Sequence, residues 1–177
     1  MGLNDRYVDL LEERWDMAMR IGKLADSSLI ARKLADVRLN ICASPAYLAG
    51  RGTPRTPADL EAHDCLGYTL SSLTGTSHWG FGTDGEIRQA VRGSLHANNG
   101  EILVQAALAG QGLVYGPRFL TSREVADGRL VEIELDVRLM EMGAIHAITH
   151  TTRKPAAKTR AWIDLLSQRL RQLAVDW

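Results

Sequence analysis

Cysteine, net charge and long apolar runs are all scarce in this sequence. Its two cysteines, Cys42 and Cys65, are too few for a disulfide scaffold. The 21 Lys and Arg residues balance 21 Asp and Glu residues, which argues against a strongly basic nucleic-acid binder. No stretch reaches the roughly 18 uninterrupted apolar residues of a membrane-spanning helix, and residues 1–6 lack the apolar run of a secretory signal. We therefore expect a cytoplasmic protein that contacts no membrane.

The composition is otherwise that of an ordinary globular protein. Apolar residues make up 45% of the chain and charged residues 24%, which excludes a disordered chain and a collagen-like one. A length of 177 residues suits one domain or two small lobes. A chain of this length buries enough surface to fold without a metal or a disulfide.

Strand-like and helix-like patterns alternate along the chain. Residues 15–22 alternate between apolar and polar side chains, as in a strand, and residues 156–173 carry apolar side chains at helical spacing. Further strands are expected over residues 29–34, 37–43, 65–70, 113–115, 130–135 and 144–149, and further helices over residues 5–14, 56–63, 98–109 and 118–126. This alternation predicts an α/β fold with largely parallel sheets.

Several short motifs suggest chemistry, and each also has a plainer interpretation. Residues 80–85 match the G-x-G-x-x-G pattern of dinucleotide sites, but a polar loop precedes them and residues 86–91 alternate like a strand, which favours a hairpin. His63, Asp64 and Cys65 are consecutive, and neighbours on a turn rarely face one another as catalytic partners do. Cys42 and Cys65 lie in apolar segments, which favours buried free thiols over a disulfide or a reactive pair. No histidine spacing matches a metal site.

Predicted helix starts carry the most information about binding. Asn98 is placed to cap a helix, with Glu101 three residues later as in a capping box, and Ser44-Pro45 makes a second start. Gly116-Pro117 breaks the chain after a buried strand. Free N–H groups at a helix start attract anions, and ligands of open α/β sheets lie at the carboxyl ends of strands. These positions are therefore either plain caps or the lining of a cleft that accepts a carboxylate or another anion.

An ordered series of segments resembles the effector-binding domain of LysR-type transcriptional regulators. The most distinctive is TPRTPADLEAHDCL at residues 53–66. The others are residues 4–13, 16–22, 27–34, 42–48 and 98–100 with 106–112. Together they span nearly the whole chain in the family's order. The resemblance implies a domain that senses a small molecule and catalyses nothing.

The resemblance also implies a fold and a binding site. The fold would be α/β and similar to the type II periplasmic binding proteins, with two α/β lobes joined by crossover strands near residues 38–43 and 144–149. Lobe I would hold residues 1–40 and 149–177, and lobe II residues 41–148. A small organic effector, often an acid in this family, would bind in the cleft between the lobes without a cofactor or metal. The residues implied to bind it are Arg20, Ile21, Ser44, Asn98, Asn99, Gly116 and Pro117.

Parts of the family pattern have no counterpart in this sequence. These are the winged helix-turn-helix, the linker helix, and the strand and helix that open lobe I. We therefore expect an N-terminally truncated chain with an incomplete lobe I, no DNA reader of its own, and self-association through an exposed sheet edge. The alternatives are a stand-alone small-molecule binding protein of the same fold and an enzyme that uses His63 or Cys65, for which no nucleophile, base and orienting group are evident.

Overall fold

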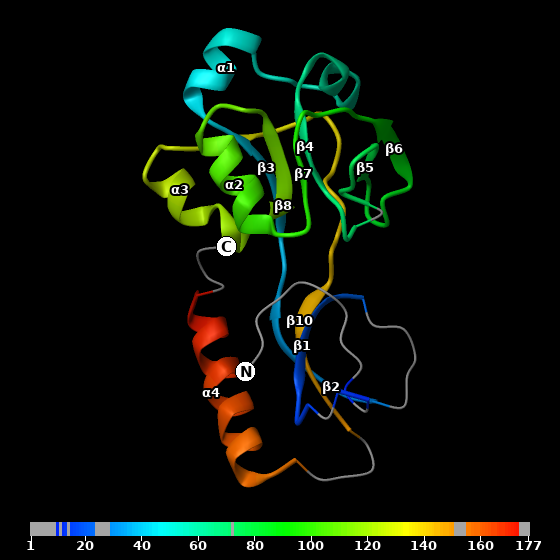
Figure 1. Ribbon diagram of the computed structural model, residues 1–177, viewed down its shortest axis with the longest axis vertical. Helices are drawn as coiled ribbons and strands as arrows, with labels where there is room; N and C mark the ends of the chain where they lie inside the picture. Colours follow the sequence, from blue (N-terminus) through cyan, green and yellow to red (C-terminus); the bar gives the residue numbers. More distant parts are fainter. Residues whose placement is uncertain are drawn as a thin grey trace. The chain divides into compact units, whose positions relative to one another are not determined.

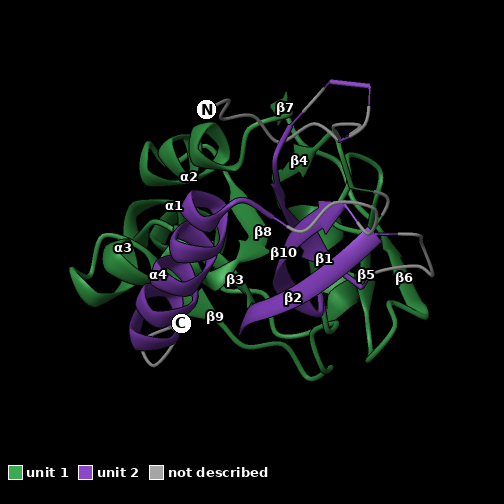
Figure 2. Ribbon diagram, turned by 90° about the horizontal axis from the view of Figure 1, so that it is seen from below, with its two compact units in different colours: residues 1–5, 39–141 green, residues 6–38, 142–177 purple. Residues whose placement is uncertain are grey.

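The computed structural model describes residues 10, 12–13, 15–23, 29–71, 73–150 and 155–173 (Figure 1). The chain forms two compact units, which are coloured separately in Figure 2. Unit 1 comprises residues 1–5 and 39–141, and unit 2 comprises residues 6–38 and 142–177. The helix expected over residues 5–14 lies almost entirely outside the described residues.

Unit 2 contains a three-stranded sheet and one long helix. Its elements are β1 (Ala18–Gly22), β2 (Leu29–Asp36), β10 (Ala144–His150) and α4 (Ala157–Leu173). β10 is the central strand and runs antiparallel to both β1 and β2, while α4 packs against β2. The predicted strand in residues 15–22 is confirmed, but Met19 and Ile21 are 45% and 41% exposed. Two apolar side chains of β1 thus remain nearly half exposed.

Unit 1 is built around a five-stranded mixed sheet with the order β7-β4-β8-β3-β9. These strands are β3 (Leu39–Ala43), β4 (Cys65–Tyr68), β7 (His96–Ala97), β8 (Leu113–Pro117) and β9 (Val131–Ile133). A separate hairpin is formed by β5 (His78–Phe81) and β6 (Ile87–Ala90). The helical segments are α1 (Pro45–Arg51), η1 (Pro57–Ala62), α2 (Gly100–Leu108), η2 (Arg118–Leu120) and α3 (Ser122–Ala126).

The prediction of largely parallel sheets is wrong. Among the described strands, parallel pairing is confined to β4 with β7 and β4 with β8. β3 runs antiparallel to β8 and β9, and both pairs in unit 2 are antiparallel. Alternating strand and helix patterns do not fix strand direction when a strand's neighbours in the sheet come from much later in the chain, as those of β3 do.

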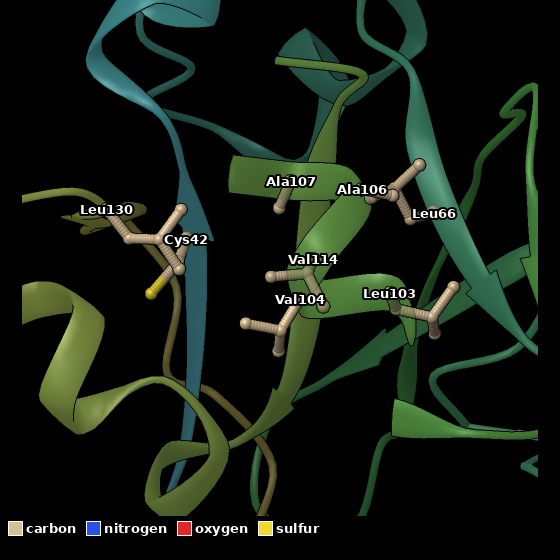
Figure 3. Close-up of a cluster of buried hydrophobic side chains, with 8 residues drawn as sticks. All are labelled: Cys42, Leu66, Leu103, Val104, Ala106, Ala107, Val114 and Leu130. Carbon is tan, nitrogen blue, oxygen red and sulfur yellow. The ribbon is translucent and has the colours of Figure 1, made fainter. Parts of the chain in front are cut away.

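A hydrophobic core lies between α2 and one face of the sheet. Figure 3 shows the labelled side chains of α2 next to Cys42 of β3, Leu66 of β4 and Val114 of β8. The residues of this core are Cys42, Leu66, Leu103, Val104, Ala106, Ala107, Val114 and Leu130. Helix positions 103, 104, 106 and 107 share one face of α2, which is the spacing expected for a helix buried on one side. We call the sheet face that carries Cys42 and Val114 the α2 face.

The hairpin β5–β6 packs against the opposite face. Tyr115 follows Val114 in β8 and therefore points away from α2. Its ring packs against Trp79 and Phe81 of β5, with ring centroids 5.3 and 5.6 Å away, and its hydroxyl donates to the Gly80 carbonyl at 3.2 Å. The G-x-G-x-x-G stretch is thus a hairpin, as its flanking pattern predicted.

No helix in the described ranges is long and apolar enough to cross a membrane.

Candidate functional site

One end of the unit 1 sheet brings together several of the predicted site residues. β7 and β8 both run parallel to β4, so their carboxyl ends reach the same edge of the sheet. β7 leads through Asn98 and Asn99 into α2, and β8 ends in Gly116 and Pro117. Because β3 runs the other way, its first residues lie here too, with Leu39 opposite Pro117 and Asn40 opposite Gly116. We call this group the Asn99 end of the sheet.

Asn99, rather than Asn98, caps α2. The Asn99 side-chain oxygen accepts a hydrogen bond from the Ile102 N–H at 3.2 Å, and its backbone is extended, as an N-cap requires. Asn98 precedes the cap and is exposed. The predicted capping box from Asn98 to Glu101 is therefore wrong, because the residue three positions after Asn99 is Ile102, whose side chain cannot accept a hydrogen bond. The helix start itself is where the sequence predicted it, and its first N–H groups give the Asn99 end a partial positive charge.

Ser44 is a helix cap but lies at the other end of the sheet. Its hydroxyl oxygen accepts from the Tyr47 N–H at 3.3 Å, as predicted for the start of α1. However, Ser44 follows the carboxyl end of β3, and a Cβ built on Gly110 would lie 3.7 Å from its hydroxyl oxygen. Gly110 lies just past the end of α2, a nine-residue helix that spans about 14 Å. The expectation that Ser44 and Asn98 face one site is wrong.

Arg20 and Ile21 belong to unit 2. Both lie in β1, where Arg20 pairs with His146 and Ile21 with Ile145 of β10. The Arg20 side chain is partly buried, whereas Ile21 is exposed. Their assignment to the effector site stays a prediction.

Asn40 and Thr121 form a buried polar pair that the sequence analysis missed. Their side chains are only 1% and 2% exposed, and the Thr121 hydroxyl donates to the Asn40 side-chain oxygen at 3.0 Å. The Asn40 side-chain nitrogen has no hydrogen-bond partner among the described residues. Burying an amide donor without a partner costs about 1–3 kcal/mol. The sequence signal for this buried pair was a single asparagine inside the otherwise apolar strand Leu39–Ala43.

The Asn99 end is partly open above Gly116. In the described part of the chain, a Cβ built on Gly116 would meet no heavy atom within 4 Å. A Cβ on Gly100, by contrast, would come within 2.7 Å of the Leu120 side chain, so η2 packs closely on the first turn of α2. Arg118 of η2 is paired with Glu132 at 3.3 Å, and its charge is therefore already compensated.

The residues that suggested enzymatic chemistry occupy structural positions. The Asp64 N–H donates to the Tyr47 hydroxyl at 2.9 Å, and the hydroxyl lies 3.1 Å from Nδ1 of buried His63. Burial and the nearby Arg51 charge lower the pKa of His63. Burial raises the pKa of the Cys42 and Cys65 thiols to about 12, so neither is a thiolate nucleophile near neutral pH. Both cysteines are free. The described residues contain no group of three or more His, Cys, Asp or Glu that could hold a metal ion.

Comparison with known proteins identifies regulators rather than enzymes. The family model described as "LysR substrate binding domain" matches residues 1–171. The transcriptional regulator CrgA of Neisseria meningitidis serogroup B is 31% identical over 167 residues, which cover 94% of this chain and 55% of CrgA. The regulator PtxR of Pseudomonas aeruginosa is 38% identical over 168 residues, which cover 94% of this chain and 53% of PtxR. The chain thus spans about half the length of the curated relatives it matches.

Solved structures give the same assignment. The CrgA regulatory domain from Neisseria meningitidis superposes with a TM-score of 0.78 at 32% identity, covering 93% of this chain and 80% of that one. The effector domain of AmpR from Pseudomonas aeruginosa superposes with a TM-score of 0.70, covering 96% of this chain and 79% of that one. Its identity is 19%, so this second match bears on the fold alone.

Proposed function

Because the chain belongs to the LysR substrate-binding domain family, we propose that it senses a small organic acid for a LysR-type transcriptional regulator. The predicted fold, similar to the type II periplasmic binding proteins, is confirmed by the match to LysR regulatory domains. The family and its curated relatives are transcription regulators, which favours this function over that of a stand-alone binding protein.

The acidic nature of the ligand is supported by the Asn99 end of the sheet. The first N–H groups of α2 point out of the helix start, where they and the helix dipole favour a negative charge. The negative charge of Glu132 is compensated by its ion pair with Arg118 of η2. The start of α2 beside the ends of β8 and β3 is the observation that carries the proposal.

The ligand contacts that we propose come from both units. In unit 1 they are Asn98, Asn99, Gly116 and Pro117, and in unit 2 they are Arg20 and Ile21, as the family resemblance implies. Ser44 is left out because it lies at the opposite end of the sheet. The cleft between lobes as the binding location and a cytoplasmic setting stay predictions.

DNA binding and assembly belong to the proposal for the whole regulator. CrgA and PtxR are each named an HTH-type transcriptional regulator, and this chain aligns with about half of each. We infer that the 177 residues supply the ligand sensor and that a helix-turn-helix segment supplies the contact to DNA. Ligand binding would then alter how copies of the regulator pair on their operator.

A thermal-shift screen tests the proposal. The chain is melted with sodium acetate, succinate and benzoate, and with the neutral amides acetamide, succinamide and benzamide as matched controls. A ligand at a hundred times its Kd stabilises the folded chain by about 2.7 kcal/mol. We expect stabilisation by at least one carboxylate and none by its amide. Asn99→Ala should weaken this response and Ser44→Ala should not. An equal response to acids and amides, or an equal effect of the two variants, contradicts the proposal.

A further inference from the structure

The hydroxyl of Tyr115 joins β8 to two other segments of unit 1. The side chain is 2% exposed, and its hydroxyl donates a hydrogen bond to the Gly80 carbonyl at 3.2 Å. The same oxygen accepts from the Met140 N–H, also at 3.2 Å. Burial raises the pKa of Tyr115 to about 12, so the hydroxyl keeps its proton throughout the physiological pH range. Both bonds therefore persist at any pH at which the protein works.

Residues 138–141, which we call the exit segment, are also held by the β5–β6 hairpin. The Gly82 N–H donates to a carbonyl of this segment at 2.7 Å, and the Thr83 carbonyl accepts from one of its N–H groups at 3.1 Å. Tyr115 adds a side-chain hydrogen bond from β8 to these backbone bonds. The exit segment is therefore fixed within unit 1.

The exit segment leads directly into unit 2. Glu141 is the last residue of unit 1 in this part of the chain, and β10 begins at Ala144. Within unit 2, the Gly143 carbonyl accepts from the Val37 N–H at 2.9 Å. Gly143 has a φ of +91°, which glycine adopts without the strain that a side chain would cause. Only Met142 separates Glu141, which is held in unit 1, from Gly143, which is held in unit 2. A shift of the exit segment therefore reaches β10 over a few peptide bonds.

The end of β8 is in contact with both stretches of chain that connect the two units. Pro117 pairs with Leu39, the first residue of unit 1 after residue 38, and Gly116 pairs with the next residue of β3. Tyr115, which immediately precedes Gly116, holds the exit segment through its hydroxyl. Gly116 and Pro117 are among the proposed ligand contacts. The strand that carries them thus touches the chain where it enters unit 1 and where it leaves.

From this arrangement we propose that Tyr115 is a positioning residue that transmits effector binding at the end of β8 to β10 through the exit segment. This role rests on the proposed function, which assigns Gly116 and Pro117 to the effector, and adds a route by which binding alters unit 2. An effector that displaces or stiffens the end of β8 acts on the Tyr115 hydroxyl, and the Met140 N–H must follow it or lose its bond. The Tyr115 ring is stacked on Phe81 in a packed interior, which leaves little free space to absorb the displacement.

Amide hydrogen exchange, measured residue by residue by NMR, tests this role. The probe is the sodium carboxylate that gives the largest thermal shift among acetate, succinate and benzoate. In the parent chain we expect its binding to slow the exchange of the Met140 amide and of the amides in residues 144–150. The expected slowing is at least about fivefold, the lower end of typical coupling between two sites.

Tyr115→Phe removes the hydroxyl and keeps the packed ring. Without ligand, we expect the Met140 amide to exchange about tenfold faster than in the parent chain, which corresponds to the loss of about one hydrogen bond. The carboxylate should still bind this variant within about fivefold of its parent affinity, because Tyr115 is not a proposed ligand contact. The ligand-induced slowing at residues 144–150 should fall below about twofold.

Tyr47→Phe is a matched control. The Tyr47 hydroxyl also accepts a backbone N–H, that of Asp64 at 2.9 Å, and the side chain is also buried. Tyr47 lies in α1, which follows the opposite end of β3 from the one that pairs with Pro117. We expect the ligand-induced slowing at residues 144–150 to be as large in this variant as in the parent chain.

Each alternative outcome has a distinct meaning. Full slowing at residues 144–150 in Tyr115→Phe overturns the proposal, and so does an equal loss of slowing in Tyr47→Phe. A parent chain that binds a carboxylate without any slowing there also overturns it, while the proposed function stands on the thermal shift. If the parent chain binds none of the three carboxylates, the proposed function fails and the role of Tyr115 fails with it.

A second measurement serves if Tyr115→Phe fails to fold. The sequence contains four tyrosines, at positions 7, 47, 68 and 115. Labelling with ¹³C at the ring carbon that bears the hydroxyl gives one signal for each, and these signals report on the hydrogen bonds of the hydroxyl groups. During titration with the same carboxylate, we expect the Tyr115 signal to shift together with the Met140 amide and the Tyr47 signal to stay fixed. A fixed Tyr115 signal in a chain whose residues 144–150 become protected would overturn the proposal.

Discussion

The network of Tyr47, His63 and Asp64 makes the stability of unit 1 depend on pH. The Tyr47 hydroxyl accepts from the Asp64 N–H and lies 3.1 Å from Nδ1 of His63, so its own proton is available for donation to the neutral form of that ring. Burial is the main cause that lowers the pKa of His63 below 6.5, and the Arg51 charge adds to it. Above about pH 7 the ring is neutral in both folded and unfolded chains and contributes no pH dependence.

The loss of stability appears as the pH falls through the pKa that His63 has in the unfolded chain. Below 6.5 the His63 ring is protonated to a greater extent in the unfolded chain than in the folded chain, so the free energy of unfolding decreases as the pH falls. Between pH 7.5 and pH 5.5 this single group can remove at most about 1.4 kcal/mol, the limit set by linkage if the folded ring stays neutral. The variant His63→Asn keeps an acceptor near the position of Nδ1 but does not titrate in this range.

Urea denaturation at the two pH values measures this effect. The parent chain and His63→Asn share the other four histidines, so the difference between their pH dependences isolates His63. We expect the parent chain to lose more stability than the variant, by up to about 1.4 kcal/mol. An identical pH dependence in the two proteins would refute the assignment of a neutral, hydrogen-bonded His63.

Four further predictions follow from features already described. Ser44→Ala should lower the free energy of unfolding by about 1 kcal/mol, read from urea denaturation, because α1 loses its cap. Cys42 and Cys65 should react with Ellman's reagent in urea but not in the native chain, because both thiols are buried with raised pKa values. The chain should fail to shift an operator duplex at physiological salt, since its net charge is zero; a shift that survives competitor DNA would contradict this. Because β1 is an outer strand with exposed Met19 and Ile21, the chain should self-associate, as measured by light scattering. Hydrogen exchange should show weaker protection at residues 15–23 than at residues 100–116. A well-protected monomer would contradict this last expectation.

Local features of the fold could be read directly from the sequence. Ser44 before Pro45 predicted the start of α1, and the hairpin around residues 80–87 followed from its alternating flanks. Each of these depends on neighbours within a few residues, where propensity and capping chemistry decide the outcome. The cap of α2 was misplaced by one residue because Asn98 and Asn99 are chemically equivalent, and only the backbone conformation distinguishes them.

Features that depend on strand pairing could not be read in the same way. Ser44 and Asn98 both begin helices, and a parallel sheet would have placed them at one edge. The antiparallel pairing of β3 with β8 separates them instead. Asn40 was overlooked for a related reason. Its burial and its hydrogen bond with Thr121 arise only in the folded chain.

The split of unit 2 along the chain sets an order for its folding during synthesis. β1 and β2 leave the ribosome early, but the strand between them, β10, is made only after the whole of residues 39–141. Unit 2 therefore cannot complete its sheet until residues 144–150 have been translated, whereas residues 39–141 already hold all five strands of the unit 1 sheet. A folded unit 1 brings the ends of its own segment to fixed positions and so reduces the entropy that β10 must overcome to insert. Variants that slow the folding of unit 1 should leave β1 and β2 unpaired for longer on the nascent chain, where they are open to aggregation and proteolysis.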